Sequence, residues 1–302
     1  MARRERSAGS DYRTDIAAPA RDHAAAPSRP ALPLELDDIN FVREGRSIVA
    51  GVSLRVDHGE NWLVLGANGS GKTTLLRIAA MYEHPSSGTV RVLGEQLGRT
   101  DVRVLRRRVG YVSAALASQF RPELSAHDVV MTARYAALEP WWHRYDDADR
   151  AQAIACLQRM DVAHLAGRSL ATLSSGEQQR VFLARTLMND PGVILLDEPA
   201  ARLDLPGREQ LIAALDDVAD DPAAPPFVLV THHVEEVPVS VTHALLLRGG
   251  VAVAQGPIDD ALTSASLSAC FDMPLGFERR RDGRLTAWAR HERVRSVRSD
   301  PA

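Results

Sequence analysis

The amino-acid sequence predicts an α/β fold built around a mostly parallel sheet. Short apolar runs of strand length occur at 62–65, 193–196, 227–230 and 244–247. Stretches with helical spacing separate these runs, and a glycine-rich loop at 66–71 joins the first run to such a stretch. Strands that are apolar on both faces and alternate with helices are typical of a parallel sheet covered on both sides.

The composition is that of a globular protein of 302 residues. Hydrophobic residues make up 45% and charged residues 25% of the chain, and the net charge of −3 gives no global basic field of the kind that binds nucleic acid. No apolar run approaches the roughly 18 residues that a membrane-spanning helix needs. The first residues, MARRERS, are followed by no apolar stretch and do not resemble a secretory signal. We therefore expect a soluble, cytoplasmic protein that reaches a membrane only through a partner.

Two compositional details concern cysteine and lysine. Cys156 and Cys270 lie far apart and form no CxxC pattern, which argues against a zinc site or a disulfide framework. Of the 36 basic residues, 35 are arginine and Lys72 is the only lysine. A compact ammonium fits inside a ring of backbone groups, whereas a guanidinium is a wide planar fork. The single lysine therefore supports a specialised site around Lys72.

Composition divides the chain into three parts. Residues 1–31 are rich in Ala, Arg, Pro and Ser without apolar periodicity, which predicts a disordered tail. Residues 32–275 contain the alternating strands and helices, with short β-like runs near the start and a mostly helical stretch at about 116–190. Residues 276–302 contain the turn signal Asp282-Gly283, which predicts a β-hairpin followed by an arginine-rich tail.

The loop GANGSGKTT, residues 66–74, matches the phosphate-binding pattern G-x-x-x-x-G-K-[ST] between a strand and a helix. Its glycines allow backbone amides to surround a β-phosphate, and the helix N-terminus adds positive potential. Lys72 would reach the β- and γ-phosphates, and the Thr73 hydroxyl would ligate Mg²⁺. The nucleotide-binding residues predicted here are Gly66, Asn68, Gly69, Ser70, Gly71, Lys72, Thr73 and Thr74. The alternative is an ordinary glycine-rich turn.

A second loop at LSSGEQQR, residues 173–180, opens a helix that we expect to run from Glu177 to about Met188. Ser174 and Glu177 have the spacing of a capping box, and a helix N-terminus that carries a serine and Gly176 is a second phosphate-binding surface. The segment resembles the LSGGQ signature of ABC ATPases; an ordinary capped helix is the alternative. In that family the signature of one subunit covers the ATP of the other. The resemblance therefore implies a head-to-tail homodimer and assigns Ser174, Gly176 and Glu177 to ATP binding.

The apolar run that begins at Gly192 ends in two carboxylates, Asp197 and Glu198, at the edge where an α/β sheet places ligand chemistry. The resemblance implies that Asp197 holds Mg²⁺ and that Glu198 is the general base that polarises the attacking water. The spacing from Ser174 to Glu198 matches that of the family. The alternative is an Asp-Glu pair that caps the turn at Pro199.

Two smaller elements follow in the family's order. Leu203-Asp204 resembles the end of the D-loop, which assigns Asp204 to the nucleotide site. His232 follows the strand at 227–230 and resembles the switch histidine that contacts the γ-phosphate. The resemblance covers about residues 34–255 and implies the P-loop ABC ATPase fold, with a mostly parallel core sheet, an antiparallel β subdomain and an inserted helical subdomain at about 116–190. It also implies Lys72, Glu198 and His232 as catalytic residues and ATP and Mg²⁺ as ligands.

Three positions depart from the family pattern. The Q-loop glutamine, which links the nucleotide to the membrane partner, is replaced by Ser113-Ala114, and Gln119 is the candidate to compensate. The aromatic residue that stacks on adenine is replaced by Arg43, whose guanidinium can also stack on a base. Ser175 replaces a signature glycine. The Ser-rich Q-loop and the THHVEE segment at 231–236 resemble the molybdate/photorepair-like branch of these ATPases.

These motifs predict an ATPase subunit that drives a separate integral-membrane permease at the cytoplasmic face of the membrane. Exporters often fuse permease and ATPase, so the lack of a spanning segment favours an importer. The alternative is a soluble ABC ATPase outside transport, in DNA repair, ribosome-linked work or cluster assembly, which the missing glutamine favours. The presence of Glu198 and His232 argues against a third interpretation, an ATP-binding regulator that does not hydrolyse ATP. The adjacent Trp141 and Trp142 either mark an interface or pack inward.

Overall fold

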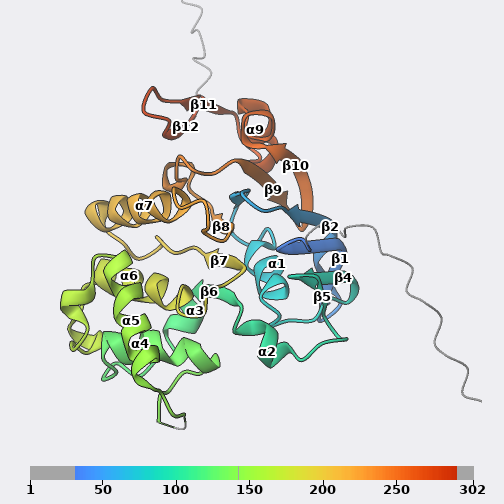
Figure 1. Cartoon of the computed structure of the whole chain (residues 1–302). Helices are drawn as coiled ribbons and strands as arrows, with labels where there is room; N and C mark the ends of the chain where they lie inside the picture. Colours follow the sequence, from blue (N-terminus) through green and yellow to red (C-terminus); the bar gives the residue numbers. More distant parts are fainter. Residues whose placement is uncertain (1–30, 142, 291–302) are drawn as a thin grey trace, which may run out of the picture. The chain divides into compact units, whose positions relative to one another are not determined.

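The computed structural model describes residues 31–141 and 143–290, so the tail predicted at 1–31 lies outside the described residues except for Ala31. A six-stranded sheet in the order β10–β9–β3–β8–β7–β6 forms the centre (Figure 1). All neighbouring strands are parallel except β10, which pairs antiparallel with β9. The strands are β3 (Trp62–Leu65), β6 (Val109–Ser113), β7 (Val193–Asp197), β8 (Phe227–Thr231), β9 (His243–Arg248) and β10 (Val251–Pro257). This arrangement confirms the predicted fold class.

The central strands are apolar on both faces because both faces of the sheet are covered. Along β3, Leu63 and Leu65 belong to one buried cluster, whereas Trp62 and Val64 belong to another. The first cluster includes side chains of the helical subdomain, and the second includes side chains of α1 (Lys72–Ala79) and the antiparallel sheet. Each fully buried side chain of this size contributes roughly 1.5–3 kcal/mol to stability relative to its exposed state.

A four-stranded antiparallel sheet in the order β2–β1–β4–β5 packs against α1. Its strands are β1 (Leu34–Arg43), β2 (Arg46–Val56), β4 (Ser87–Val92) and β5 (Glu95–Gln96). β1 and β2 mix buried and exposed positions, as expected for strands with one face on the core. Glu44 and Gly45 both have positive φ and join the two strands by a two-residue turn, which places Arg46 opposite Arg43.

The chain between β6 and β7 is mostly helical. It forms α3 (Ala114–Ala117), α4 (Ala126–Met131), η1 (Thr132–Tyr135), α5 (Asp147–Arg159), η2 (Ala163–Leu165), η3 (Leu170–Thr172) and α6 (Ser175–Thr186). The four α-helices start at capping side chains that accept a bond from the first turn, namely Ser113, Ser125, Asp146 and Ser174. The sequence placed the start of α6 at Glu177, but the capping box puts that glutamate inside the first turn.

The other helices flank the sheet and the C-terminal hairpin. They are α2 (Val102–Arg106), α7 (Leu205–Ala219), η4 (Val234–Glu236), α8 (Ile258–Ala261) and α9 (Ser264–Phe271). β11 (Leu275–Arg279) and β12 (Leu285–Ala289) form an antiparallel pair after α9 (Figure 1). The sequence did not predict β10, α8 or α9. β10 has no fully buried residue, and α8 and α9 are too short for a clear helical period.

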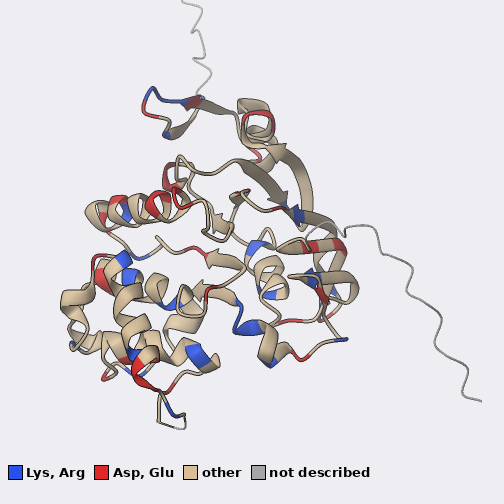
Figure 2. Cartoon of the chain, viewed as in Figure 1, with Lys and Arg blue, Asp and Glu red and all other residues tan. Residues whose placement is uncertain are grey.

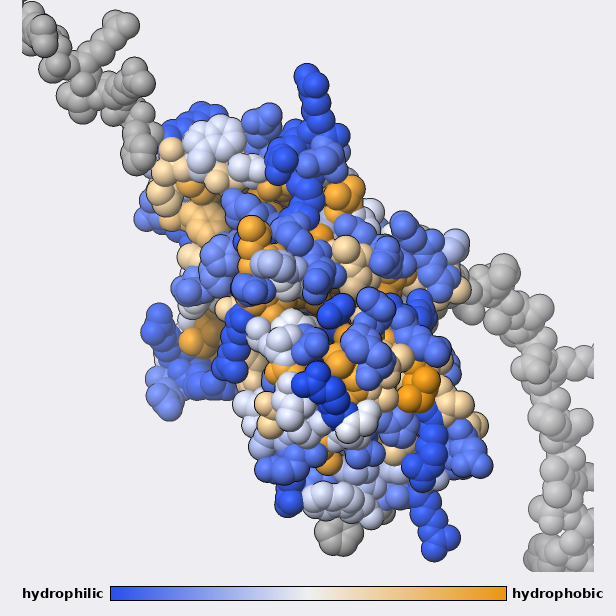
Figure 3. All heavy atoms as spheres, turned by 90° about the vertical axis from the view of Figure 1, so that its left-hand side faces the viewer, coloured by the Kyte–Doolittle hydropathy of each residue, from blue (hydrophilic) through white to orange (hydrophobic). Residues whose placement is uncertain are grey.

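The surface on the side of α5, α6 and α7 is mainly hydrophilic, and its apolar groups show in small separate patches (Figure 3). That face therefore presents no broad apolar area of the kind that marks a protein or membrane contact. Within residues 31–141 and 143–290, no helix has the length and apolar character needed to cross a bilayer.

Candidate functional site

In the loop after β3, two glycines stand where no side chain fits. A Cβ at Gly66 would lie 2.2 Å from the carbonyl oxygen of Leu247 in β9, and one at Gly71 would lie 2.7 Å from that of Ile48 in β2. Gly71 also has a φ of +100°, which favours glycine. The loop is thus held between two strands and leads its backbone directly into the N-terminus of α1.

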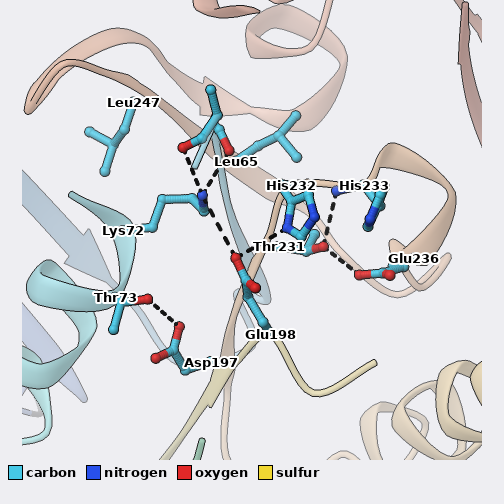
Figure 4. Close-up of polar contacts among 12 residues, drawn as sticks. Leu65, Lys72, Thr73, Asp197, Glu198, Thr231, His232, His233, Glu236 and Leu247 are labelled. Carbon is cyan, nitrogen blue, oxygen red and sulfur yellow. Dashed lines mark hydrogen bonds and ion pairs between the residues drawn. The ribbon is translucent and has the colours of Figure 1, made fainter. Parts of the chain in front are cut away.

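Lys72, the first residue of α1, is buried, with 4% of its surface exposed. Its Nζ donates to the carbonyl oxygens of Gly66 at 2.7 Å and Ala67 at 3.1 Å, and it lies 3.9 Å from Oε1 of Glu198 (Figure 4). Burial lowers the pKa of the Lys72 ammonium, while the carboxylates of Glu198 and Asp197 raise it. The loop therefore holds a compact cation beside a carboxylate.

Thr73 and Asp197 bring a hydroxyl oxygen and a carboxylate oxygen together. Thr73 Oγ1 donates to Oδ1 of Asp197, at the end of β7, over 3.0 Å. Burial raises the pKa of Asp197 to about 6, although the bond from Thr73 lowers it. A buried carboxyl group that is poorly compensated favours a nearby cation, and hydroxyl and carboxylate oxygens suit Mg²⁺. No cluster of three or more His, Cys, Asp or Glu side chains in the described chain could hold a metal, so the pair needs further ligands from water or phosphate.

Glu198 is held in an uncommon backbone conformation, with a φ of +49°. Its backbone N–H donates to the carbonyl oxygen of Val230 at 2.9 Å, which ties the end of β7 to β8. Oε1 of Glu198 lies 3.1 Å from Nδ1 of His232, so one carboxylate oxygen faces both the imidazole and the ammonium of Lys72 (Figure 4). The three side chains predicted to be catalytic thus converge from α1 and from the ends of β7 and β8.

A hollow of about 330 Å³ lies over the loop. Its lining residues are Arg46, Ile48, Asn68, Gly69, Ser70, Gly71, Lys72, Thr73, Thr74 and Glu198. Every predicted residue of the loop except Gly66 therefore faces this space. The sequence reasoning missed Arg46 and Ile48 of β2. The turn at Glu44-Gly45 was the available signal, because it sets Arg46 opposite Arg43.

Arg43, which the sequence assigned to nucleobase stacking, is not among the lining residues of the hollow. Its Nη2 donates to Oε1 of Glu83 at 3.0 Å, and Arg77 contacts the same oxygen at 3.1 Å. The Arg43 guanidinium also lies over the ring of Phe41, at 5.3 Å from its centroid. Glu83 and Phe41 therefore fix this side chain on the neighbouring surface of the β1–β2 sheet.

The predicted signature residues form helix caps. Oε2 of Glu177 accepts from the backbone N–H of Ser174 at 2.7 Å, and Oγ of Ser174 accepts from that of Glu177 at 3.3 Å. Asp204 caps α7 by accepting from the N–H of Gly207 at 2.9 Å. A Cβ at Gly176 would lie 3.5 Å from the Cα of Gly207, so the starts of α6 and α7 lie side by side. Ser174, Gly176, Glu177 and Asp204 do not line the hollow over the loop.

The expected Q-loop position is occupied by a strand end and a helix start. Ser113 is buried at the end of β6, in register with Asp197 of β7. Its Oγ accepts from the N–H of Leu116 and so caps α3, which begins at Ala114. Gln119 donates from Nε2 to the carbonyl oxygen of Ala115 at 3.1 Å and lines a different groove. The structure thus places Gln119 outside the group around Asp197.

That second groove, about 450 Å³ in volume, lies between β6, α2 and the helical subdomain. Arginine and aromatic side chains dominate its wall: Arg103, Arg106, Arg107, Arg185, Tyr82, Tyr111, Tyr135 and His143. No aspartate or glutamate of the described residues lines it, and Figure 2 shows basic residues on α2 and the segment that follows. Arg185 donates to Thr132 Oγ1 and the Ala137 carbonyl oxygen, and burial lowers its pKa to about 10.

Of the two adjacent tryptophans, Trp142 lies outside the described residues. Trp141 is 58% exposed, and the guanidinium of Arg121 lies over its ring at 4.6 Å from the centroid. For Trp141 the inward-packed alternative is therefore wrong, and its indole is available to solvent or to a partner.

The chain matches known proteins along most of its length. The family model described as "ABC transporter" matches residues 49–201. The uncharacterized ABC transporter ATP-binding protein YlmA of Bacillus subtilis (strain 168) is 38% identical over 243 residues, which are 80% of this chain and 92% of that protein. An ABC transporter ATP-binding protein of Streptococcus mutans is 34% identical over 80% of this chain and 93% of its own length.

The fold is also that of a solved protein. A dimeric ATP-binding cassette in a post-hydrolysis state with ADP and Pi superposes with a TM-score of 0.65 at 24% identity. The match covers 74% of this chain and 98% of the other. At this identity the likeness concerns the fold, including the mixed arrangement of a parallel core, an antiparallel sheet and a helical insertion.

Proposed function

Because this chain belongs to the ATP-binding family of ABC transporters and is an ATPase of that family, we propose that it hydrolyses Mg²⁺-bound ATP at the loop after β3 to drive a separate membrane permease. One observation carries the site: a carboxylate oxygen of Glu198 faces both Lys72 and His232. A general base held in this way at the edge of a phosphate-binding loop suits the attack of water on a γ-phosphate.

ATP binding is assigned to the residues that line the hollow and to Gly66 beneath it. Backbone amides of the loop and the N-terminus of α1 surround the β-phosphate. Lys72 exchanges its carbonyl partners for phosphate oxygens, which its short flexible stem permits. Thr73 and Asp197 would hold Mg²⁺, which when bound neutralises charge that develops on the phosphates.

Hydrolysis is an in-line displacement on the γ-phosphorus. Glu198 takes a proton from the water whose oxygen forms the new bond to phosphorus, and the bond from the γ-phosphorus to the bridging oxygen breaks to release ADP. In its doubly protonated form His232 would donate from Nδ1 to the carboxylate of Glu198 and from Nε2 to a γ-phosphate oxygen. Charge stabilisation and positioning of this kind supply most of the catalysis in phosphoryl transfer.

The signature residues complete the site of a second copy. Ser174, Gly176, Glu177 and Asp204 lie together at the starts of α6 and α7 but outside the hollow of their own chain. Their helix N-termini offer N–H groups and positive potential to an anion. We therefore assign them to the ATP that the partner's loop holds, in a head-to-tail homodimer.

The nucleobase end of the site is built on β1 and β2. Arg43 is the proposed stacking platform, held by Glu83 and backed by Phe41. Arg46 and Ile48 line the space between that platform and the loop. A guanidinium stacks on a base through its planar face, so the arginine replaces the usual aromatic ring.

The permease would dock in the groove between α2 and the helical subdomain. Four arginines and no carboxylate of the described residues line it, while Val109, Leu116 and Leu138 give it an apolar floor. A helix of the permease with acidic and apolar side chains matches this wall in charge and character. The protein then works at the cytoplasmic face of the membrane, and import is the favoured direction.

The second candidate function is that of a soluble ABC ATPase that does not take part in transport. It is favoured by the presence of Ser113-Ala114 where the family has the Q-loop glutamine. No glutamine stands there to connect Asp197 to the groove, and Gln119 donates instead to the Ala115 carbonyl oxygen of α3, the helix that precedes it. An ABC ATPase that acts on a soluble target would not need that connection.

Co-purification separates the two candidates. We expect the full chain isolated from gently solubilised membranes of its own organism to bring an integral-membrane protein, and the charge reversals Arg103→Glu and Arg107→Glu to abolish this association. Arg55→Glu on β2, an exposed arginine away from the groove, is the matched control. Recovery of the chain only in soluble complexes would favour the second candidate.

A further inference from the structure

The segment that carries His232 is fixed from inside by two buried side chains. Oγ1 of Thr231, at the end of β8, donates to Oε2 of Glu236 in η4 and accepts from the backbone N–H of His233 at 3.1 Å (Figure 4). Thr231 is fully buried and Glu236 nearly so. Within η4 the N–H of Glu236 also donates to the carbonyl oxygen of His233 at 3.3 Å. Hydrogen bonds within residues 231–236 therefore hold the turn after His232 in one conformation.

The turn of the C-terminal hairpin holds the same segment from outside. Arg284, just before β12, donates from Nη1 to Oε2 of Glu209 at 2.8 Å and from Nη2 to Oε1 at 3.3 Å. Nη2 also donates to the carbonyl oxygen of Glu235 at 2.7 Å. One guanidinium thus joins α7 to η4. Its fork contacts both carboxylate oxygens, an arrangement with well-defined geometry.

Packing brings this arginine to η4 and limits its freedom. A Cβ at Gly283 would lie 2.9 Å from Cγ1 of Val239, so the hairpin turn sits directly on the chain that follows η4. Leu285 belongs to the same buried cluster as Val234 and Val237. Only 21% of the Arg284 side chain is exposed, which reduces solvent screening of its bonds.

We propose that Arg284 is a positioning residue for ATP hydrolysis, because it holds the Glu235 carbonyl against α7 and thereby keeps His232 directed at Glu198. The physical reason is that only a few bonded residues separate the Glu235 carbonyl from His232. Glu235 precedes Glu236, whose bond to Thr231 fixes the turn in which His232 lies. A displacement of about 1 Å of a catalytic group can cost about 100-fold in rate. The inference rests on the role of His232 proposed above.

Arg284 also connects this segment to the proposed dimer face. α7 carries Glu209 one turn after its capping residue Asp204, and the start of α7 lies against the start of α6. The Arg284 guanidinium thus joins the C-terminal hairpin to η4 and α7, and the signature helix α6 lies next to the start of α7.

The test compares Arg284→Ala with Arg280→Ala in the full-length protein. Arg280 lies in the same hairpin turn, but its side chain pairs only with Asp282 of that turn among the described residues. We expect Arg284→Ala to lower kcat for ATP hydrolysis about tenfold, the effect of losing a hydrogen bond to a charged group, with KM for ATP unchanged. Arg280→Ala should retain full kcat. Equal kcat in both variants would overturn the proposal.

A double-mutant cycle with His232→Ala separates positioning from general loss of structure. If Arg284 acts through His232, Arg284→Ala lowers kcat in the native background and has no further effect when His232 is already alanine. The same tenfold loss in both backgrounds would overturn the inference while leaving the proposed function intact. If His232→Ala alone keeps full kcat, the proposed catalytic role of His232 is wrong, and the inference about Arg284 that rests on it is wrong as well. Thermal unfolding of each variant reports whether folding has changed.

Discussion

At the scale of single residues, the chemistry of the site depends on where the loop and the strand ends place a few side chains. The carbonyl oxygens of Gly66 and Ala67 surround the ammonium of Lys72, and Glu198 lies just beyond. In a chain with 35 arginines and one lysine, this geometry explains why the position holds lysine. We expect that a wider guanidinium could not take the same place between these two carbonyl oxygens without moving the loop.

The substitution Lys72→Arg keeps the charge and tests that geometry. We expect it to reduce kcat/KM for ATP by at least about 100-fold, a loss typical of removing a preorganised charge contact. Steady-state ATPase assays and binding of a fluorescent ATP analogue measure the effect. Arg91→Lys on the antiparallel sheet is the matched control and should change neither quantity. Native turnover in Lys72→Arg would show that the compact ammonium is not required.

The raised pKa of Asp197 predicts that the stability of the metal-free protein depends on pH. Burial raises its folded pKa to about 6 from an ordinary value of 3.8. A raised folded pKa means that the folded state binds the proton more tightly, so this stabilising contribution is present below about pH 4 and is lost as the pH rises to about 6. Asp197→Asn should therefore be more stable than the native protein at pH 8, by up to about 3 kcal/mol, and inactive.

Denaturant unfolding in EDTA at pH 8 and pH 4 measures this difference. The two proteins should have similar stability at pH 4, where both side chains are neutral. A variant that is less stable than the native protein at pH 8 would show that the Asp197 charge is well compensated in the folded state.

Residue-level reasoning predicted the loop and the carboxylate pair because their spacing is local. It did not find Arg46 and Ile48, which reach the hollow through the pairing of β1 with β2. Nor could it predict that Glu83 and Phe41 hold Arg43, since those contacts depend on how separate strands and α1 pack.

At the scale of elements, caps decide where the functional helices begin. Ser174 and Glu177 satisfy each other's backbone N–H groups at the start of α6, whereas Asp204 caps α7 by accepting one bond from the N–H of Gly207. These caps are formed within one chain, so they fix the position of the helix starts without contacts from a partner chain. The sequence pattern was sufficient to predict the cap of α6, because a capping box is contained within four residues, but the cap of α7 at Asp204 was not predicted.

Ser174→Ala should separate the structural role of that cap from its proposed role at the nucleotide. Loss of an N-cap costs about 1 kcal/mol of stability, which denaturant unfolding measures. Ser125→Ala, which removes the cap of α4, is the control, because its hydroxyl accepts from the N–H of Asp128 in the same way. Both variants should lose similar stability, but only Ser174→Ala should lose ATPase activity. Equal activity in the two variants would leave Ser174 with capping alone.

Elements without a strong local pattern were harder to predict. The buried strands β3, β7 and β8 appear in the sequence as unbroken apolar runs, since both of their faces are covered. β10 is largely exposed, and α9 buries mainly Leu267 and Cys270, so tertiary packing rather than periodicity specifies them. The sequence predicted the hairpin turn at Asp282-Gly283, but it did not predict the contact of that turn with η4.

At the scale of the whole molecule, the proposed dimer assigns two separate surfaces of one chain to two different ATP sites. The loop, Asp197, Glu198 and His232 surround the hollow, whereas the signature and Asp204 lie elsewhere on the described chain. Two copies placed head to tail would complete both sites and bury ATP between them. Binding of ATP would then be coupled to association, and hydrolysis to separation.

The most direct measurement is the mass in solution of Glu198→Gln with Mg²⁺-ATP. The glutamine keeps the size of the side chain but cannot accept the proton from water, so ATP should persist and hold two chains together. Light scattering coupled to size-exclusion chromatography should give twice the monomer mass of 32.9 kDa with ATP and the monomer mass with ADP. Lys72→Ala in the same background should remain monomeric. A Glu198→Gln protein that binds ATP yet stays monomeric would contradict the shared site.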